Sequence, residues 1–215
     1  MPSLLAKHWT FDPTRVFLNH GSFGACPDFV VEEQRRWQDL MEKEPVQFFE
    51  ELMPDLLHKS RTALGEFLSC DANDLAFVSN ATSGVNTILR SLHFEQGDEI
   101  LVPNHAYQAC RNTIDFVASR WGAKVVEVAI PFPIDGPQVV IDLMKSACSE
   151  RTKLVMIDTV TSPTGLRMPF EELTEFFEGK GVEVLLDAAH GIGMIPLNLE
   201  KLGASYVTSN CHKWL

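Results

Sequence analysis

The stretch at 182–215, VEVLLDAAHGIGMIPLNLEKLGASYVTSNCHKWL, decides the fold that this chain predicts. Its first apolar run, 182–186, leads directly into Asp187, and a second apolar run, 204–208, ends shortly before Lys213. Short apolar runs of this kind are consistent with buried strands. The carboxyl ends of parallel strands share one edge of an open α/β sheet, where such sheets bind ligands. The pattern therefore predicts that a carboxylate and an amine lie in one cleft.

Three more polar side chains follow the same two runs. His190 comes soon after Asp187, and Asn210 and His212 come just before Lys213. We expect all five side chains to share the carboxyl edge of the sheet.

An aspartate and a lysine in one cleft suit the chemistry of pyridoxal phosphate. The lysine amine forms a Schiff base with the cofactor aldehyde, and the carboxylate keeps the pyridine nitrogen protonated so that the ring accepts electrons. Lysine can do this because desolvation favours its neutral amine, whereas arginine stays charged. Each residue alone has an ordinary explanation: an aspartate after a strand usually caps a turn, and a His-Lys pair usually lies at the surface.

The motifs DAAH, 187–190, and NCHKW, 210–214, resemble those of the class V aminotransferase family of fold-type I pyridoxal phosphate enzymes. Within that family they are most similar to the branch of isopenicillin N epimerase-like proteins and C–S lyases. The resemblance implies that Lys213 is the Schiff-base lysine and Asp187 the partner of the pyridine nitrogen.

The same resemblance gives roles to the neighbouring residues. It implies that His190 lies near the phenolic oxygen of the cofactor ring, and that Asn210 and His212 bind the phosphate or brace the lysine. Desulfurases of the family often carry serine before the His-Lys pair, where this chain has Asn210 and Cys211. This difference favours the epimerase-like branch.

Short apolar runs alternate with helical segments from Asp74 onward, which predicts a parallel sheet with crossover helices. The expected strands are 75–79, 99–102, 124–128, 154–158, 182–187 and 205–208, and the expected helices are 85–91, 107–121, 138–149, 170–178 and 199–202. The resemblance implies an incomplete three-layer α/β/α large domain of fold-type I enzymes, with a mostly parallel sheet and an N-terminal helical arm. We expect the arm and its helices within 1–70 and the partial cofactor-binding domain within 71–215, with the C-terminal small domain of the family absent.

Two helices are expected in the N-terminal part. The first begins after Asp28, and the second covers 45–68, where Pro54 kinks or splits it. Apolar residues near helical spacing are expected to be buried. They are Phe29, Val30, Trp37, Leu40, Met41, Phe48, Leu52, Leu56, Leu57, Leu64 and Phe67.

The segment SNATSGVN, 79–86, places small hydroxyl residues at the entry to a helix. Free backbone N–H groups and the helix dipole favour a phosphate there. Thr82 and Ser83 are therefore candidate phosphate ligands, and their position matches the phosphate loop of the resembled family. An ordinary N-cap is the alternative. The segment has neither the GxxxxGK[ST] nor the GxGxxG pattern.

The segment PNHAYQAC, 103–110, follows the next expected strand. A flat side chain at this position could stack on the pyridine ring. The resembled family uses a histidine or an aromatic residue here, so both His105 and Tyr107 are candidates.

Two more loops acquire roles from the resemblance. The turn DTVTSPTGLRMP, 158–169, brings Thr161 and Ser162 towards the cofactor ring, although a turn without a ligand is the alternative. The segment LNHGSFG, 18–24, is otherwise a surface loop, but in the family it helps to contact substrate. The candidate substrate-binding residues are Asn19, His20, Gly21 and Ser22.

Composition excludes several classes of function. The 215 residues are 45% hydrophobic and carry a formal net charge of -11, which argues against nucleic-acid binding. No run approaches the roughly 20 apolar residues of a membrane span. The five cysteines are odd in number and lack metal-ligand spacing, so we expect no metal site, a cytoplasmic location and reduced thiols that are mostly buried.

The predicted function is that of a pyridoxal phosphate-dependent enzyme acting on an amino acid. A lyase that cleaves a C–S bond ranks first by resemblance, with an aminotransferase or an amino-acid epimerase as alternatives. The other alternative is a non-catalytic cofactor-binding chain that associates with itself or with a longer paralogue. The family implies a homodimer, and its substrate-carboxylate arginine has no match among Arg111, Arg120, Arg151 and Arg167.

Overall fold

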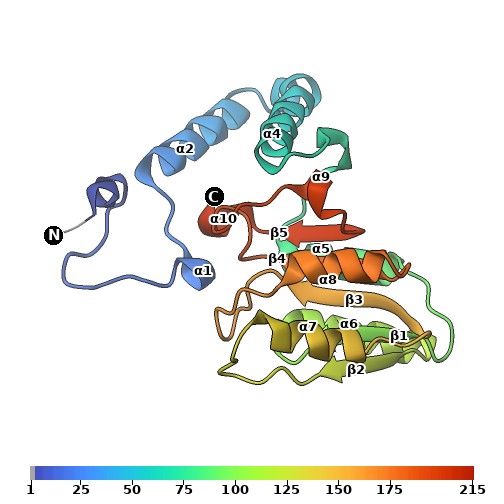
Figure 1. Cartoon of the computed structure of the whole chain (residues 1–215). Helices are drawn as coiled ribbons and strands as arrows, with labels where there is room; N and C mark the ends of the chain where they lie inside the picture. The colour runs from blue at the N-terminus through green and yellow to red at the C-terminus, as the bar shows by residue number, and fades with distance from the viewer. Residues whose placement is uncertain (1–2) are drawn as a thin grey trace. The chain divides into compact units, whose positions relative to one another are not determined.

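The computed structural model describes residues 3–215 and shows two compact units, the first ending at Ala76 and the second beginning at Phe77 (Figure 1). The second unit contains all the strands. They are β1 (Glu99–Pro103), β2 (Lys124–Val128), β3 (Thr152–Asp158), β4 (Glu183–Ala188) and β5 (Tyr206–Ser209). All neighbouring pairs are parallel, in the order β2-β1-β3-β4-β5. The parallel sheet predicted from the sequence is therefore confirmed.

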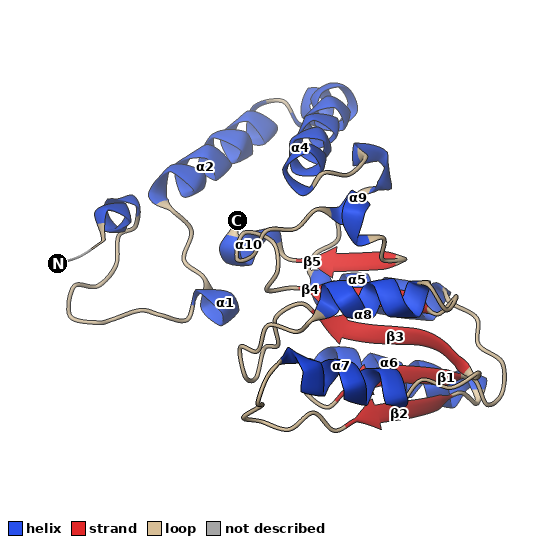
Figure 2. Cartoon of the chain, viewed as in Figure 1, coloured by secondary structure: helices blue, strands red, loops and turns tan. Residues whose placement is uncertain are grey.

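Helices cover both faces of this sheet (Figure 2). They are α5 (Ala81–Ser91), α6 (Gln108–Trp121), α7 (Pro137–Ser146), α8 (Phe170–Glu178), α9 (Leu199–Leu202) and α10 (Cys211–Trp214). One buried cluster joins α5 and α6 to one face of the sheet, and a second joins α7 and α8 to the other face. The three-layer α/β/α arrangement is thus confirmed.

Strand β3 shows how the sequence determines these faces. Leu154 and Met156 belong to the α5–α6 cluster, while Val155 and Ile157 belong to the α7–α8 cluster. Side chains alternate along a strand, so Asp158 continues the α5–α6 face. Both faces are covered, and for that reason the strand is a continuous apolar run without polar alternation.

The strand order reverses direction between β1 and β3. The chain first adds β2 on one side of β1 and then adds β3, β4 and β5 on the other side. Ligands of open α/β sheets bind outside the carboxyl ends of the strands at such a switch point. The ends of β1 and β3 therefore mark one side of the candidate site.

The strand expected at 75–79 is absent, and that prediction was wrong. A short 3-10 helix, Ala72–Asp74, precedes this segment, and Phe77 and Val78 lie half-exposed without a neighbouring strand. Strand β5 pairs only with β4. The apolar residues gave the pattern of a strand, but a strand also needs a paired neighbour. The single turn of α10 was not expected from the sequence.

The first unit is helical. It contains η1 (Leu4–His8), α1 (His20–Phe23), α2 (Asp28–Lys43), α3 (Pro45–Gln47), η2 (Phe48–Leu52) and α4 (Met53–Leu68). The predicted split near Pro54 occurs: η2 is a π-helical turn, and Pro54 lies in the first turn of α4, where its missing N–H costs little. The loop expected at 18–24 contains the short helix α1.

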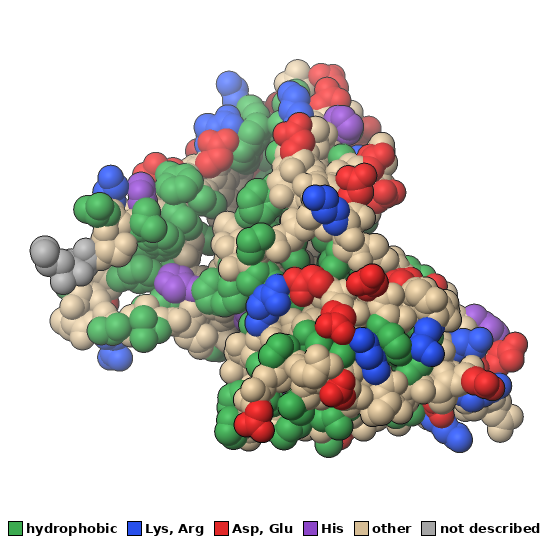
Figure 3. Space-filling model, viewed as in Figure 1, with side chains coloured by type: hydrophobic (Ala, Val, Ile, Leu, Met, Phe, Trp, Pro, Cys, Tyr) green, Lys and Arg blue, Asp and Glu red, His purple; other side chains and the backbone are tan. Residues whose placement is uncertain are grey.

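Most apolar residues expected to be buried in α2 and α4 are not. Phe29 is 59% exposed and Phe67 is 56% exposed, while Trp37 and Leu40 are half-buried. Figure 3 shows hydrophobic side chains at the surface of this N-terminal part. An amphipathic pattern identifies the apolar face of a helix, but it does not identify the surface against which that face packs.

The expectation about the cysteines was also largely wrong. All five are free thiols, but only Cys110 is buried, and Cys26 and Cys211 are exposed. Within residues 3–215, no helix is both long and apolar enough to cross a membrane.

Candidate functional site

Asp187 is held at the carboxyl end of β4 and is 3% exposed. Its Oδ1 atom accepts a hydrogen bond from the Ala189 amide at 3.0 Å, and its Oδ2 atom accepts one from Cys110 Sγ at 3.4 Å. Burial, and then the charge of Asp187, raise the pKa of the Cys110 thiol. Cys110 therefore stays a neutral donor and fixes the carboxylate towards α6.

Lys213, in α10, lies beside the turn that follows β4. Its Nζ atom is 3.2 Å from His190 Nε2. Burial lowers the pKa of Lys213, and the nearby charge of Asp187 opposes this shift. Asp187 thus lies close enough for its charge to act on Lys213.

The first turn of α5 brings together parts of the chain that are far apart in sequence. Asn80 caps this helix by accepting from the Ser83 amide at 2.8 Å, and Asn210 Oδ1, after β5, accepts from the Ala81 amide at 2.8 Å. Because Asn80 is the cap, the hydroxyls of Thr82 and Ser83 are not needed for capping. The alternative explanation for these two residues, an ordinary N-cap, is therefore wrong.

Helix α5 approaches β5 closely at Gly84. A Cβ atom on Gly84 would lie 2.9 Å from Thr208 Cγ2. The absence of a side chain lets the first turn of α5 reach the strand that leads to Asn210. This contact positions the candidate phosphate loop.

Asp158 is a residue that the sequence reasoning did not select. It pairs in register with Asp187, is equally buried, and its Oδ1 atom has no hydrogen-bond partner within the described chain. Burial, and then the charge of Asp187, raise the pKa of Asp158 well above its usual range. We infer that Asp158 is the protonated member of the pair. Its position at the end of an apolar run was the available signal.

We expect Asp158→Asn to stabilise the cofactor-free protein at neutral pH. A carboxyl whose pKa is raised by folding binds its proton more tightly in the folded chain, so stability falls as pH rises above its unfolded pKa. Asparagine carries no such cost. Thermal unfolding should show that the stability advantage of the variant over the wild type increases between about pH 4 and about pH 7. The exposed Asp135→Asn variant is the control, and an advantage that does not change with pH would contradict the assignment.

His105 and Tyr107 differ sharply in their surroundings. His105 is 7% exposed, its Nδ1 atom lies 3.0 Å from Thr164 Oγ1, and its Nε2 atom lies 3.0 Å from the Ile130 carbonyl oxygen. A carbonyl only accepts, so Nε2 carries the proton and Thr164 donates to Nδ1. Both ring nitrogens are thus occupied. Tyr107, just before α6, is 46% exposed and free to contact a ligand.

The turn after β3 is held by its own hydroxyl groups. Thr161 Oγ1 lies 2.7 Å from Thr164 Oγ1 and accepts from the Leu166 amide at 2.9 Å. Thr161 is buried, whereas Ser162 is exposed. The structure brings Thr161 into the network of His105 and leaves Ser162 open to a ligand.

His212 is exposed, and its ring makes no hydrogen bond within residues 3–215. Asn19, His20, Gly21 and Ser22 belong to the first unit, in and just before α1. Their substrate-contact role stays a prediction.

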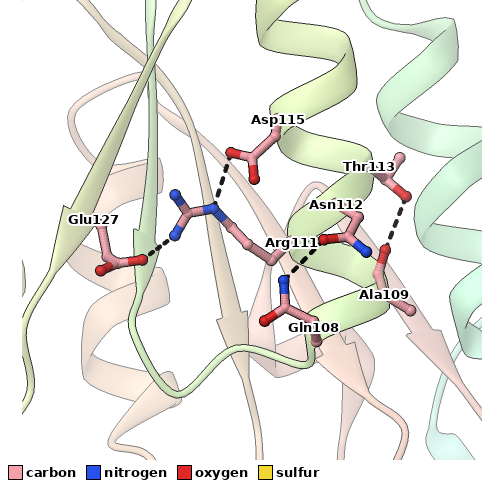
Figure 4. Close-up of polar contacts among 7 residues, drawn as sticks. All are labelled: Gln108, Ala109, Arg111, Asn112, Thr113, Asp115 and Glu127. Atoms are coloured by element: carbon pink, nitrogen blue, oxygen red, sulfur yellow. Dashed lines mark hydrogen bonds and ion pairs between the residues drawn. The ribbon is translucent and has the colours of Figure 1, made fainter.

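Three arginines of the second unit, Arg111, Arg151 and Arg167, are paired with acids. Arg111 donates from α6 to Asp115 at 3.1 Å and to Glu127 on β2 (Figure 4). Arg151 pairs with Asp98, and Arg167 pairs with Glu171. These partners neutralise the guanidinium charges. An open groove of about 1270 Å³ along α8 and α9 contains none of the predicted site residues.

Fold and site together define a parallel α/β protein with a buried acid and a desolvated amine at the carboxyl edge of its sheet. Residues 36–215 match the aminotransferase class-V family, so the chain belongs to that family. It is 33% identical over 212 residues to an L-cysteine desulfhydrase of Arabidopsis thaliana, covering 92% of this chain and 47% of that protein. It is 31% identical over 204 residues to the isopenicillin N epimerase of Streptomyces clavuligerus, covering 95% of this chain and 51% of that protein.

Solved structures share the fold. A complex of the cystine C–S lyase C-DES with cysteine persulfide superposes with a TM-score of 0.83 at 23% identity, covering 92% of this chain and 53% of that one. The apo cysteine desulfurase of Thermococcus onnurineus gives a TM-score of 0.77 at 20% identity, covering 91% of this chain and 49% of that one. The chain thus spans about half the length of the proteins that it matches.

Proposed function

We propose that the chain binds pyridoxal phosphate and acts on an amino acid, with cleavage of a C–S bond in cysteine or a related compound as the first candidate reaction. The observation that carries this proposal is the desolvated Lys213 amine, 3.2 Å from His190 and within range of the buried Asp187. The family and its desulfhydrase relatives support the choice of reaction.

The residues present fit the cofactor chemically. Pyridoxal phosphate needs an amine for its aldehyde, a carboxylate for its ring nitrogen and donors for its phosphate. Lys213, Asp187 and the first turn of α5 supply these groups at one edge of the sheet. The Thr82 and Ser83 hydroxyls add donors beside the helix N-terminus, which favours an anion.

Each residue then has a defined task. The bound cofactor supplies an electron sink that stabilises negative charge at the substrate α carbon. Asp187 keeps the proton on the ring nitrogen, and the buried, protonated Asp158 adds no second charge beside it. Lys213 would move the proton at the α carbon as general base and acid.

The later steps separate the candidate reactions. Proton loss at the α carbon is common to a C–S lyase, an epimerase and an aminotransferase. A lyase then expels the sulfur from the β carbon and yields sulfide, pyruvate and ammonia from cysteine and water. Cys211, two residues before Lys213, has no part in these steps: it lies in α10, and the pKa of its thiol is raised above the ordinary value by partial desolvation.

The test uses the purified chain with added pyridoxal phosphate and L-cysteine in deuterium oxide. Exchange of the α proton, measured by NMR, reports the shared first step. Sulfide with equal pyruvate identifies the lyase, D-cysteine identifies the epimerase, and amino transfer to an added oxo acid identifies the aminotransferase. Bound cofactor without exchange for any amino acid would favour the non-catalytic alternative.

We propose that Tyr107, rather than His105, stacks on the cofactor ring, since Tyr107 is 46% exposed whereas His105 is only 7% exposed. Tyr107→Ala should weaken cofactor affinity about 5-fold, because an aromatic pair contributes on the order of 1 kcal/mol. Tyr107→Phe, the matched control, should bind nearly as well as the wild type in a spectroscopic titration. His105→Ala should lower thermal stability more than affinity, and the reverse pattern would identify His105 as the stacking residue.

We also propose that the chain forms a homodimer through its first unit. Large apolar side chains of this unit are exposed, although such groups usually pack on another surface. They include Leu4, Val16, Leu18, Phe23 and Phe29. Light scattering should give twice the chain mass of 24.1 kDa. A monomer at all concentrations would reject the dimer without affecting the cofactor site.

A further inference from the structure

The hydrogen bonds around His190 have fixed directions. Trp214 Nε1 lies 3.1 Å from His190 Nδ1. An indole nitrogen can only donate, so Nδ1 must be the accepting, unprotonated nitrogen. The single proton of the neutral imidazole is then on Nε2, the atom that faces Lys213.

This tautomer determines the state of the lysine. His190 Nε2 and Lys213 Nζ are 3.2 Å apart. An ammonium group has three donors and no acceptor, so it could not bond to an Nε2–H group. A neutral amine has one lone pair and can accept that hydrogen. The geometry is therefore satisfied only when Lys213 is uncharged.

We propose that Trp214 is a positioning residue: its indole N–H fixes His190 as the Nε2–H tautomer, and His190 in turn holds Lys213 as a neutral amine. The relay depends on this chain's own side chains and exists without a cofactor. Only the purpose of the neutral amine rests on the proposed function, because a neutral lysine is the form that can attack the aldehyde of a cofactor.

The backbone supports the position of Trp214 independently. Gly193, in the turn after His190, has a φ angle of +80°, which favours glycine. A Cβ atom on Gly193 would collide with the carbonyl group of Trp214. The turn that carries His190 and the backbone that carries Trp214 therefore pack in direct contact, which is possible because residue 193 lacks a side chain.

The charged groups around the relay agree with this arrangement. Asp187 from β4 and the neutral thiol of Cys110 from α6 lie near Lys213, and Asp187 also acts on His190. Burial lowers the pKa of both Lys213 and His190, while the charge of Asp187 opposes the shift in each. Two neutral partners joined by one hydrogen bond agree with the larger of these influences, which is burial.

The first test observes the wild-type protein without cofactor. Nitrogen-15 NMR correlations of the histidine side chains distinguish a protonated Nε2 from a protonated Nδ1. We expect His190, assigned through loss of its signals in His190→Gln, to be the Nε2–H tautomer at neutral pH. A protonated Nδ1 would overturn the proposal without any variant of Trp214.

The second test measures how Trp214 affects the lysine. Limited modification of the cofactor-free protein by an amine-reactive acetylating reagent, followed by peptide mapping, gives the rate at Lys213 as a function of pH. Trp214→Phe should shift the pH profile of Lys213 modification to higher pH by about one unit, so that the rate at neutral pH falls. Trp121→Phe is the matched control, because Trp121 also lies against a histidine ring, that of His93, with centroids 4.1 Å apart.

Circular dichroism shows whether Trp214→Phe keeps its fold. A folded variant with an unchanged Lys213 rate would refute the role of Trp214. Pyridoxal phosphate could fail to bind while the Nε2–H tautomer and the effect of Trp214→Phe are both observed. That result would reject the proposed function but would still support the positioning role of Trp214.

Discussion

Lys213→Ala is expected to abolish the visible absorption band of the bound cofactor and to reduce turnover by about 10²–10⁴-fold, the range for loss of a general acid–base group. In the proposed function the amine of Lys213 both attaches the cofactor and moves the substrate proton, so one substitution should remove both actions. Absorption spectra and α-proton exchange measure the two effects separately.

Lys201→Ala is the control, since Lys201 lies exposed in α9, away from the carboxyl edge. It should bind cofactor and exchange the α proton as the wild type does. If Lys213→Ala kept the band while Lys201→Ala lost it, the amine of the site would be wrongly identified.

Asp187→Asn is expected to keep the attached cofactor but to lower turnover by about 10²–10³-fold, as loss of a key electrostatic contact does. Asparagine has nearly the same shape and removes only the charge that keeps the ring nitrogen protonated. The cofactor should remain bound through Lys213 and the first turn of α5. A large loss of turnover with bound cofactor is therefore the specific signature of this residue.

The Asp187→Asn result has a further consequence for the neighbouring acid. The charge of Asp187 helps to raise the pKa of Asp158. Its removal should reduce the pH-dependent advantage of Asp158→Asn when both substitutions are combined. Simple additivity of the two changes at every pH would show that the carboxyls do not interact.

The sheet could be predicted from the sequence because its strands are buried on both faces. Residues 154–157 form a continuous apolar run, and the structure has β3 there, at Thr152–Asp158. The run at 75–79 has similar composition but forms no strand. Strand pairing depends on a neighbour that is distant in sequence, and local composition does not carry that information.

The site was predictable as a set of residues and less so as a set of contacts. The ends of β4 and β5 led to Asp187 and Lys213. The roles of Trp214 and Asp158 depend on hydrogen-bond direction and strand register, which only coordinates supply. His105 adds a contact that the motif does not show, because both of its ring nitrogens lie within hydrogen-bond distance of groups of the fold.

The most direct test of the central claim is to find where the cofactor attaches. The chain is incubated with pyridoxal phosphate, reduced with borohydride and digested, and the modified lysine is identified by mass spectrometry. The predicted result is one phosphopyridoxyl group per chain, attached to Lys213. This labelling should be lost when phosphate analogues compete for the first turn of α5. A label spread over surface lysines, or one stoichiometric label on another lysine, would contradict the account.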